Sequence, residues 1–176
     1  MLLQRLKIPF ECVSPGVDET PLPNEKPAAM VLRLAQEKAQ AVAQQFPDSL
    51  IIGADQVGVI ENTILGKPLV YENAIKQLLL MSGQRVRFLI GLCLLNTKDN
   101  TSQVVLETFD VVFRTLTLQM IEDYLKKEPA LNCAGSFTVE GLGISLVEKL
   151  QGDDYTALIG LPLIRLVTML KDQQGI

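Results

Sequence analysis

The chain has 176 residues, of which 48% are hydrophobic and 20% are charged. This length and composition suit one globular domain with a substantial core, so we expect a single domain over residues 1–176. The formal net charge of -4 gives no general attraction for nucleic acid or for an anionic membrane surface, and neither is an expected partner. A polyanionic ligand would have to meet locally arranged cations or a bound metal.

The numbers of cysteines and histidines limit the expected compartment and the classes of catalysis that remain open. Cys12, Cys93 and Cys133 form no C-x-x-C pair and leave an odd count, which indicates a reducing compartment, by default the cytoplasm. The sequence lacks the run of about 18 apolar residues that spans a bilayer, and the apolar segment at its start is too short for a signal peptide. The complete absence of histidine excludes Ser-His-Asp and Cys-His catalysis, so acid–base work falls to carboxylates, lysines or bound water.

The first 60 residues predict helices and strands around a loop rich in proline and acids. Residues 2–7 resemble the end of a helix, and "IPFECV" at 8–13 has the composition of a short strand. Pro27 opens a helix that extends to Phe46, because apolar residues recur at helical spacing between them. The β-branched run at 50–60 then predicts a strand.

The remaining residues continue this alternation. The expected elements are a helix from about Glu72 to Met81, an antiparallel hairpin of strands 85–95 and 103–114, a helix capped by Thr117 and extending to about Lys127, a glycine-punctuated strand region over 134–155, and a final helix after "GLP". Strands and helices mixed in this order predict an α/β fold with a mixed twisted sheet and flanking helices, in which one lobe is richer in strands.

Four charged residues are candidates for a site. Asp55 stands inside an apolar strand, where a carboxylate is costly unless it is paired, hydrogen-bonded or bound to a metal; alternatively, it accepts backbone hydrogen bonds at a bend. Glu19 lies in a proline-bounded loop, Lys38 on the flank of the first long helix, and Lys67 in "GKP" after a strand. The alternatives for these three are a solvated turn, a snorkelling lysine and a surface turn. Two acids and two lysines are compatible with a site for a metal and a polyphosphate.

Six short motifs are shared with one known family. They are "DET" at 18–20, "LAQEKA" at 34–39, "IIGADQV" at 51–57, "GKP" at 66–68, "AGSFTVEGLG" at 134–143 and "GLPL" at 160–163. In this order they resemble the Maf family of nucleoside triphosphate pyrophosphatases over essentially the whole chain. The resemblance implies a fold like that of the inosine-triphosphate pyrophosphatases. It also implies a nucleotide in a cleft between two lobes, cleaved between its α and β phosphates.

The resemblance implies roles for the four charged residues. Asp55 would act as general base for the water that attacks the α-phosphorus, or as a ligand of the divalent cation, Mg²⁺ or Mn²⁺, that activates this water. Glu19 would help to hold the metal, and Lys38 and Lys67 would offset the charge of the triphosphate. A homodimer is the assembly that the family suggests.

Two further positions concern the base of the nucleotide. By resemblance, the branch that acts on dTTP and UTP has threonine after the catalytic aspartate and glutamine in the later motif, whereas this chain has Gln56 and Glu140. This pair resembles the branch that hydrolyses 7-methyl-GTP. A carboxylate can accept hydrogen bonds from N1–H and the exocyclic amine of guanine together, and it favours the cation that methylation at N7 creates. Alternatively, Glu140 ends a strand and faces solvent.

The sequence departs from the family at its start. Family members begin with an apolar strand and an S-x-x-R loop that grips the phosphates, whereas "MLLQRLKIPFECV" matches the family only from within the helix that follows. Arg5 falls too far along the chain to replace that arginine. Either the reading frame begins upstream of Met1, or the chain is a shortened member that lacks this strand and loop.

Two kinds of function stay open from the sequence. The first is metal-assisted hydrolysis of 7-methyl-GTP to 7-methyl-GMP and pyrophosphate, with Asp55 as general base. The second is an inactive nucleotide-binding or regulatory Maf-like protein, or a pyrophosphatase for another modified nucleotide. Loss of one charge-assisted phosphate contact would lower activity by about one to two decades, and loss of several would nearly abolish it.

Overall fold

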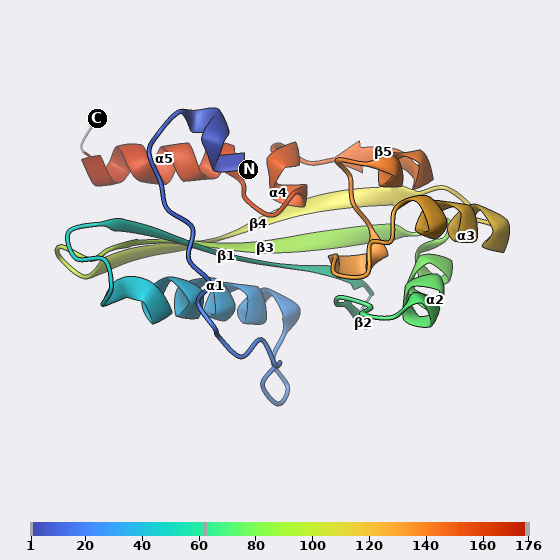
Figure 1. The fold of residues 1–176 in the computed structure, drawn as a ribbon, viewed down its shortest axis with the longest axis horizontal. Helices are drawn as coiled ribbons and strands as arrows, with labels where there is room; N and C mark the ends of the chain where they lie inside the picture. The colour runs from blue at the N-terminus through green and yellow to red at the C-terminus, as the bar shows by residue number, and fades with distance from the viewer. Residues whose placement is uncertain (1, 62, 175–176) are drawn as a thin grey trace. The chain divides into compact units, whose positions relative to one another are not determined.

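The computed structural model describes residues 2–61 and 63–174. The elements are, in chain order and with η for 3-10 helices, η1 (Leu2–Leu6), α1 (Pro27–Ala43), β1 (Leu50–Ile60), β2 (Thr63–Leu65), α2 (Tyr71–Met81), β3 (Arg85–Asn96), β4 (Thr101–Phe113), α3 (Leu118–Lys127), η2 (Ala134–Ser136), η3 (Leu142–Leu146), β5 (Val147–Gln151), α4 (Tyr155–Leu158) and α5 (Leu163–Gln174) (Figure 1). Within the described ranges, no helix has the length and apolar character needed to cross a membrane.

The five strands found in the described residues form one antiparallel sheet in the order β2-β1-β3-β4-β5. β1 pairs with β2 so that Gly58 lies opposite Leu65, and β4 pairs with β5 so that Asp110 lies opposite Gln151. β3 and β4 are neighbours in the sheet, as expected for the hairpin predicted from the turn-rich segment between them. The predicted α/β fold, a sheet with flanking helices, is therefore confirmed.

Most predicted elements lie close to their expected bounds. The strand at 50–60 coincides with β1, and the helices expected from Glu72 and after "GLP" are α2 and α5. Thr117 caps α3, because its Oγ1 accepts a hydrogen bond from the Met120 amide at 3.3 Å. α1 ends three residues before Phe46, whose amide donates to the Ala43 carbonyl in a tighter turn, at 3.2 Å.

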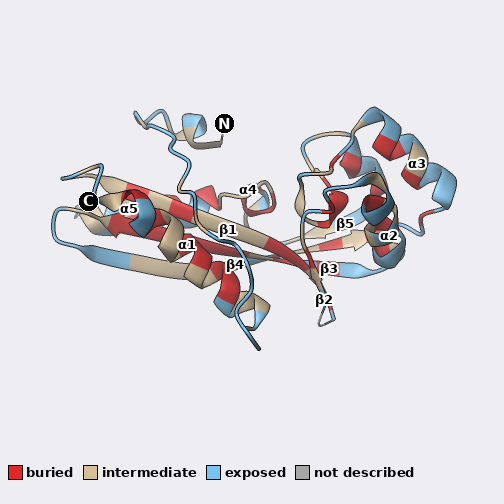
Figure 2. Cartoon of the chain, turned by 60° about the horizontal axis from the view of Figure 1, so that its bottom comes forward, coloured by how far each residue is buried: buried red, intermediate tan, exposed pale blue. Residues whose placement is uncertain are grey.

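Two expectations about strands are wrong. Residues 8–13 belong to none of the five strands and are mostly exposed, like much of the segment before α1, drawn largely pale blue in Figure 2. Strand-like composition does not produce a strand where no neighbouring strand accepts its backbone hydrogen bonds. In the 134–155 region β5 is the one strand, because Gly135 and Ser136 both have positive φ, at 67° and 56°, and Leu142–Leu146 form the 3-10 helix η3.

The chain forms two compact units, each assembled from separate segments. Unit 1 comprises Met1–Gln56, Ile90–Glu107 and Asp154–Ile176, and unit 2 comprises Val57–Leu89 and Thr108–Asp153. Unit 1 therefore contains α1, α4 and α5, whereas unit 2 contains β2, α2, α3 and β5. β1, β3 and β4 each contribute residues to both units.

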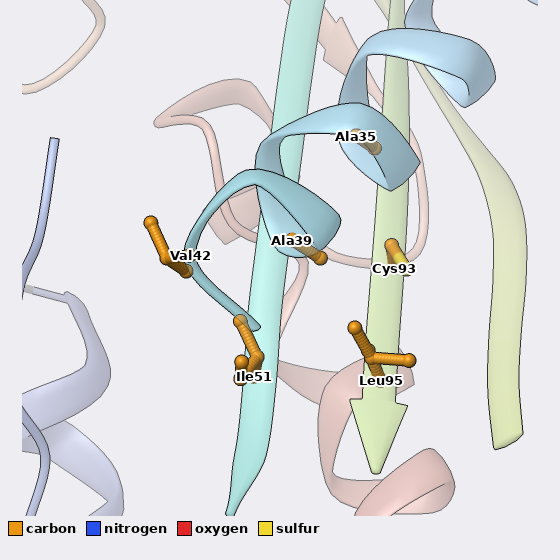
Figure 3. Packing of buried hydrophobic residues seen from close by; sticks show 6 residues of the cluster. All are labelled: Ala35, Ala39, Val42, Ile51, Cys93 and Leu95. Carbon is orange, nitrogen blue, oxygen red and sulfur yellow. The ribbon is translucent and has the colours of Figure 1, made fainter. Parts of the chain in front are cut away.

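Small residues allow α1 to lie very close to the sheet in unit 1. Ala35 and Ala39 are fully buried on the side of α1 that faces β1 and β3 (Figure 3). A Cβ added at Gly53 of β1 would overlap the carbonyl oxygen of Ala35, and one added at Gly91 of β3 would overlap the backbone of Val31. Glycine is therefore required at these two places by the approach of the helix backbone.

The opposite side of the strands in unit 1 packs against α5. Successive strand residues point to opposite faces, so the residues that alternate with those under α1 form a second cluster. Its buried members are Leu92, Leu94, Leu163, Leu166 and Met169, and its partly buried members include Leu2, Leu3, Leu6, Leu50, Ile52 and Ala54. α1 and α5 thus cover opposite faces of the strands within this unit, and η1 packs on the α5 side.

Gly53→Ala tests the close approach of α1. The added methyl group forces the helix backbone to shift, and we expect a loss of about 1–3 kcal/mol in the free energy of unfolding, measured by urea titration. Gly66→Ala is the matched control, because an added Cβ at Gly66 meets nothing within 4 Å. Equal stability of the two variants would contradict the close approach.

Candidate active site

Asp55 lies in the middle of β1 on the side that faces α1. Because strand side chains alternate, it shares this side with Ile51 and Gly53, which lie beneath the helix. The Asp55 side chain is only 9% exposed. A carboxylate in such a position has lost most of its hydration and requires a charged or hydrogen-bonding partner.

Lys38 of α1 is a partner of Asp55. Its Nζ donates to Asp55 Oδ1 at 2.6 Å and lies 2.7 Å from Glu19 Oε1. The Lys38 side chain is 17% exposed, and that of Glu19 is 45% exposed. One ammonium thus bridges a buried carboxylate and a more exposed one. Three of the residues singled out from the sequence are therefore brought together.

The ion pairs keep Lys38 charged. Burial disfavours the ammonium, but the hydrogen bonds to Asp55 and Glu19 and the negative charge of both outweigh burial and raise the pKa of Lys38 above its usual 10.5. Lys38 is therefore a cation at neutral pH. It can hold a carboxylate or a phosphate oxygen, but it is unsuited to act as a general base.

Glu19 is carried by a turn in the long segment before α1. The Asp18 carboxylate accepts hydrogen bonds from the Thr20 amide at 2.9 Å and from the Thr20 hydroxyl at 2.6 Å. Both bonds lower the pKa of Asp18. Glu19 is the central residue of this turn, so the turn presents its side chain toward Lys38, as the ion pair shows.

Glu19 and Asp55 have the chemistry to share a divalent cation. Each has a carboxylate oxygen within 2.7 Å of the same Nζ, and carboxylate oxygens are the protein ligands that Mg²⁺ and Mn²⁺ prefer. In the described part of the chain, no group of three or more His, Cys, Asp or Glu could hold a metal by itself. The donor set therefore fits a metal that also takes oxygens from a bound ligand, as Mg²⁺ does with phosphates.

Gln56 points to the other face of the strand. Its Nε2 donates to the carbonyl oxygen of Leu158, at the end of α4, at 3.1 Å. A Cβ added at Gly160 would lie 3.6 Å from Gln56 Oε1, so the "GLP" turn also lies against this side chain. The side chains of these consecutive β1 residues therefore point to opposite sides of the sheet, Asp55 toward α1 and Gln56 toward α4.

Lys67 belongs to unit 2, in the segment between β2 and α2. Lys67 is exposed. The backbone carbonyls of the residues before and after it both accept hydrogen bonds. The Gly66 carbonyl accepts from Gln77 Nε2 at 3.1 Å and from the Gly135 amide at 3.2 Å. The Pro68 carbonyl accepts from the Val70 amide at 2.8 Å. The backbone that carries Lys67 is thus fixed on both sides, while its side chain reaches solvent.

Glu140 also belongs to unit 2 and is exposed, in the turn that leads into η3. The structure shows a turn at this position rather than the end of a strand. Glu128 anchors the turn, because its Oε2 accepts a hydrogen bond from the Leu142 amide at 2.5 Å. A Cβ at Gly141 would overlap the Glu128 carboxylate, so a larger residue directly after Glu140 would displace the side chain that anchors the turn.

Two polar residues that support the Lys67 segment were not singled out from the sequence. Ser136 is fully buried, and its hydroxyl donates to Gln77 Oε1 at 2.6 Å, while the Gln77 amide nitrogen holds Gly66. The available signal was the position of Gln77, three residues after buried Ala74 on the inner face of α2. A polar residue on a buried helix face needs a partner, and here both ends of the amide have one.

Two comparisons with known proteins show which family the chain belongs to. The profile of the family described as Maf-like protein matches residues 1–173. A 7-methyl-GTP pyrophosphatase from Nitrosococcus oceani is 53% identical to this chain over 170 residues, which cover 97% of this chain and 85% of the relative. A match of this extent, over the segments that carry the ion-paired acids and the two lysines, establishes descent from a common ancestor. The chain belongs to the Maf family.

Proposed function

We propose that this chain is a nucleoside triphosphate pyrophosphatase that hydrolyses 7-methyl-GTP to 7-methyl-GMP and pyrophosphate. The observation that carries the proposal is the 53% identity to a 7-methyl-GTP pyrophosphatase over 97% of the chain. The ion-paired group of Glu19, Lys38 and Asp55 supports it, because hydrolysis of an anhydride needs an acceptor for the proton of water and positive charge near the phosphates.

Asp55 is the proposed general base. The water oxygen attacks the α-phosphorus, the bond from that phosphorus to the bridging oxygen breaks, and pyrophosphate leaves with the bonding electrons. The Asp55 carboxylate takes the proton of the attacking water. The absence of histidine and the charged state of Lys38 leave a carboxylate as the suitable base in this group.

Positive charge near the phosphates comes from three sources in this proposal. Lys38 and Lys67 provide ammonium groups, each charge-assisted contact contributing about 1.5–3 kcal/mol. A divalent cation, Mg²⁺ or Mn²⁺, held by Glu19 and Asp55, would neutralise phosphate charge and lower the pKa of the attacking water. Lys38 already contacts both acids, so it also holds their oxygens in place before substrate arrives.

Glu140 is the proposed determinant of base specificity. Its carboxylate can accept from N1–H and the exocyclic amine of guanine, and it favours the positive charge of a 7-methylated base. Exposure of Glu140 in an anchored turn supports this role, because the carboxylate is accessible while the adjacent backbone is fixed. Gln56 is proposed as a supporting residue rather than a contact to the base, because its side chain lies on the face of β1 opposite Asp55 and donates to the Leu158 carbonyl.

The cytoplasm is the proposed compartment. Within residues 2–61 and 63–174, Cys12, Cys93 and Cys133 form no disulfide, and burial raises the pKa of Cys93 to about 11. Cysteines outside disulfides suit a reducing compartment, where a nucleotide substrate is also present.

Asp55→Asn is the first test of the proposed chemistry. The amide oxygen can still accept from Lys38, so the fold is kept, but the base is lost and turnover falls at least about 100-fold. Release of pyrophosphate from 7-methyl-GTP measures this, with circular dichroism as the check on folding. Asp48→Asn, the same change at an exposed position just before β1, is the control and keeps wild-type turnover. Unchanged turnover in Asp55→Asn would contradict the assignment of Asp55 as general base.

Glu140→Gln tests the proposed specificity. Loss of a two-point contact with guanine lowers kcat/KM for 7-methyl-GTP by about 10- to 100-fold and leaves the rate with UTP unchanged. Glu148→Gln, at an exposed position of β5 in the same unit, is the control for loss of one negative charge. An equal loss on both nucleotides, or no loss, would remove Glu140 from the recognition of the base.

A further inference from the structure

Arg33 of α1 holds the segment that precedes the helix. Its Nε and Nη2 donate to the two carboxylate oxygens of Glu25, each at 2.7 Å, in the two-point geometry that only arginine provides. The side chains of Glu25 and Arg33 are 8% and 20% exposed, so this ion pair is largely sheltered from water. The hydrogen bond from Arg33 lowers the pKa of Glu25 to about 2, so the pair persists across the physiological pH range.

The same guanidinium also reaches the turn that carries Glu19. Arg33 Nη2 donates to the carbonyl oxygen of Thr20 at 3.4 Å, and Thr20 closes the turn with Asp18. Glu25 in turn accepts from the Leu22 amide at 2.9 Å. Arg33 therefore fixes the segment at residues 20 and 25, and the first of these is the neighbour of Glu19.

Glu19 depends on such support from outside its own ion pair. Its side chain is 45% exposed, and exposed ion pairs hold a flexible segment only weakly. Residues 8–22 contain no helix or strand that would fix their backbone. The sheltered pair between Arg33 and Glu25 is the stronger attachment of this segment to α1.

We propose that Arg33 and Glu25 are positioning residues that hold Glu19 against Lys38 and Asp55. The proposal rests on the proposed function for its effect on catalysis. Neither residue touches the reacting group; both act through the turn that presents Glu19. Loss of the pair leaves Glu19 chemically intact but spreads its carboxylate over many positions, so that it meets Lys38 only part of the time.

The experiment is a double-mutant cycle of Glu25→Gln and Glu19→Gln in the full chain. Glu25→Gln alone should lower kcat/KM for 7-methyl-GTP by about 10- to 100-fold, with the same division between kcat and KM as Glu19→Gln. In the Glu19→Gln background the second change should cost less than about twofold, because the residue it positions is already disabled. Losses that multiply would overturn the proposal.

The matched control is Glu37→Gln. Glu37 is the other carboxylate on Arg33, 2.9 Å from Nη1 and 41% exposed, and this ion pair lies within α1 rather than joining it to the preceding segment. Its loss should leave kcat/KM within about twofold of wild type. Arg33→Lys is the second positioning variant, because it keeps the charge and loses the two-point contact. Arg33→Lys should reproduce the loss in Glu25→Gln, and wild-type activity would overturn the proposal.

Hydrogen exchange of the Thr20 amide gives a readout that does not depend on activity. This amide is bonded to Asp18 rather than to Glu25, so it reports on the turn itself. We expect its exchange to be at least about tenfold faster in Glu25→Gln and unchanged in Glu37→Gln. Unchanged exchange in Glu25→Gln would contradict the positioning role. Lack of turnover by the wild-type chain would instead reject the proposed function, and the exchange measurement would still decide the role of the pair.

Discussion

The close contact between α1 and the sheet is the constraint on which the candidate site depends. Gly53 and Gly91 have no side chain, so the helix backbone fills the space above them. Ala35 and Ala39 have small side chains, which lets the helix approach the strands closely. Lys38 precedes Ala39, so this contact brings its ammonium to a carboxylate of β1. A larger residue at either glycine would move the cation and its partner apart.

Charge in this acidic chain is organised locally rather than over the whole surface. Lys38 is held by two carboxylates, and the sheltered pair of Arg33 and Glu25 fixes the segment that carries one of them. The backbone around Lys67 is fixed instead by hydrogen bonds to the carbonyls of the residues on either side of it. A cation that is placed before a ligand arrives loses little freedom on binding, and under the proposed function this favours contact between Lys38 and the phosphate groups.

The sequence was sufficient for features that repeat locally and insufficient for contacts between distant segments. α1 followed from a period of 3.6 residues and β1 from its apolar, β-branched run, and the two-residue period of a strand places Asp55 and Gln56 on opposite faces. The pair of Arg33 and Glu25 was not predicted, because it depends on how an irregular segment returns to the helix. The false strand at 8–13 has the same origin, since composition does not reveal whether a partner strand lies alongside.

The most direct test of the account is product analysis of 7-methyl-GTP hydrolysis in oxygen-18 water, with magnesium or manganese present. The account predicts equal amounts of 7-methyl-GMP and pyrophosphate, with the heavy oxygen in 7-methyl-GMP, because water attacks the α-phosphorus. Formation of 7-methyl-GDP and phosphate, heavy oxygen in pyrophosphate, or lack of turnover by the folded chain would contradict it.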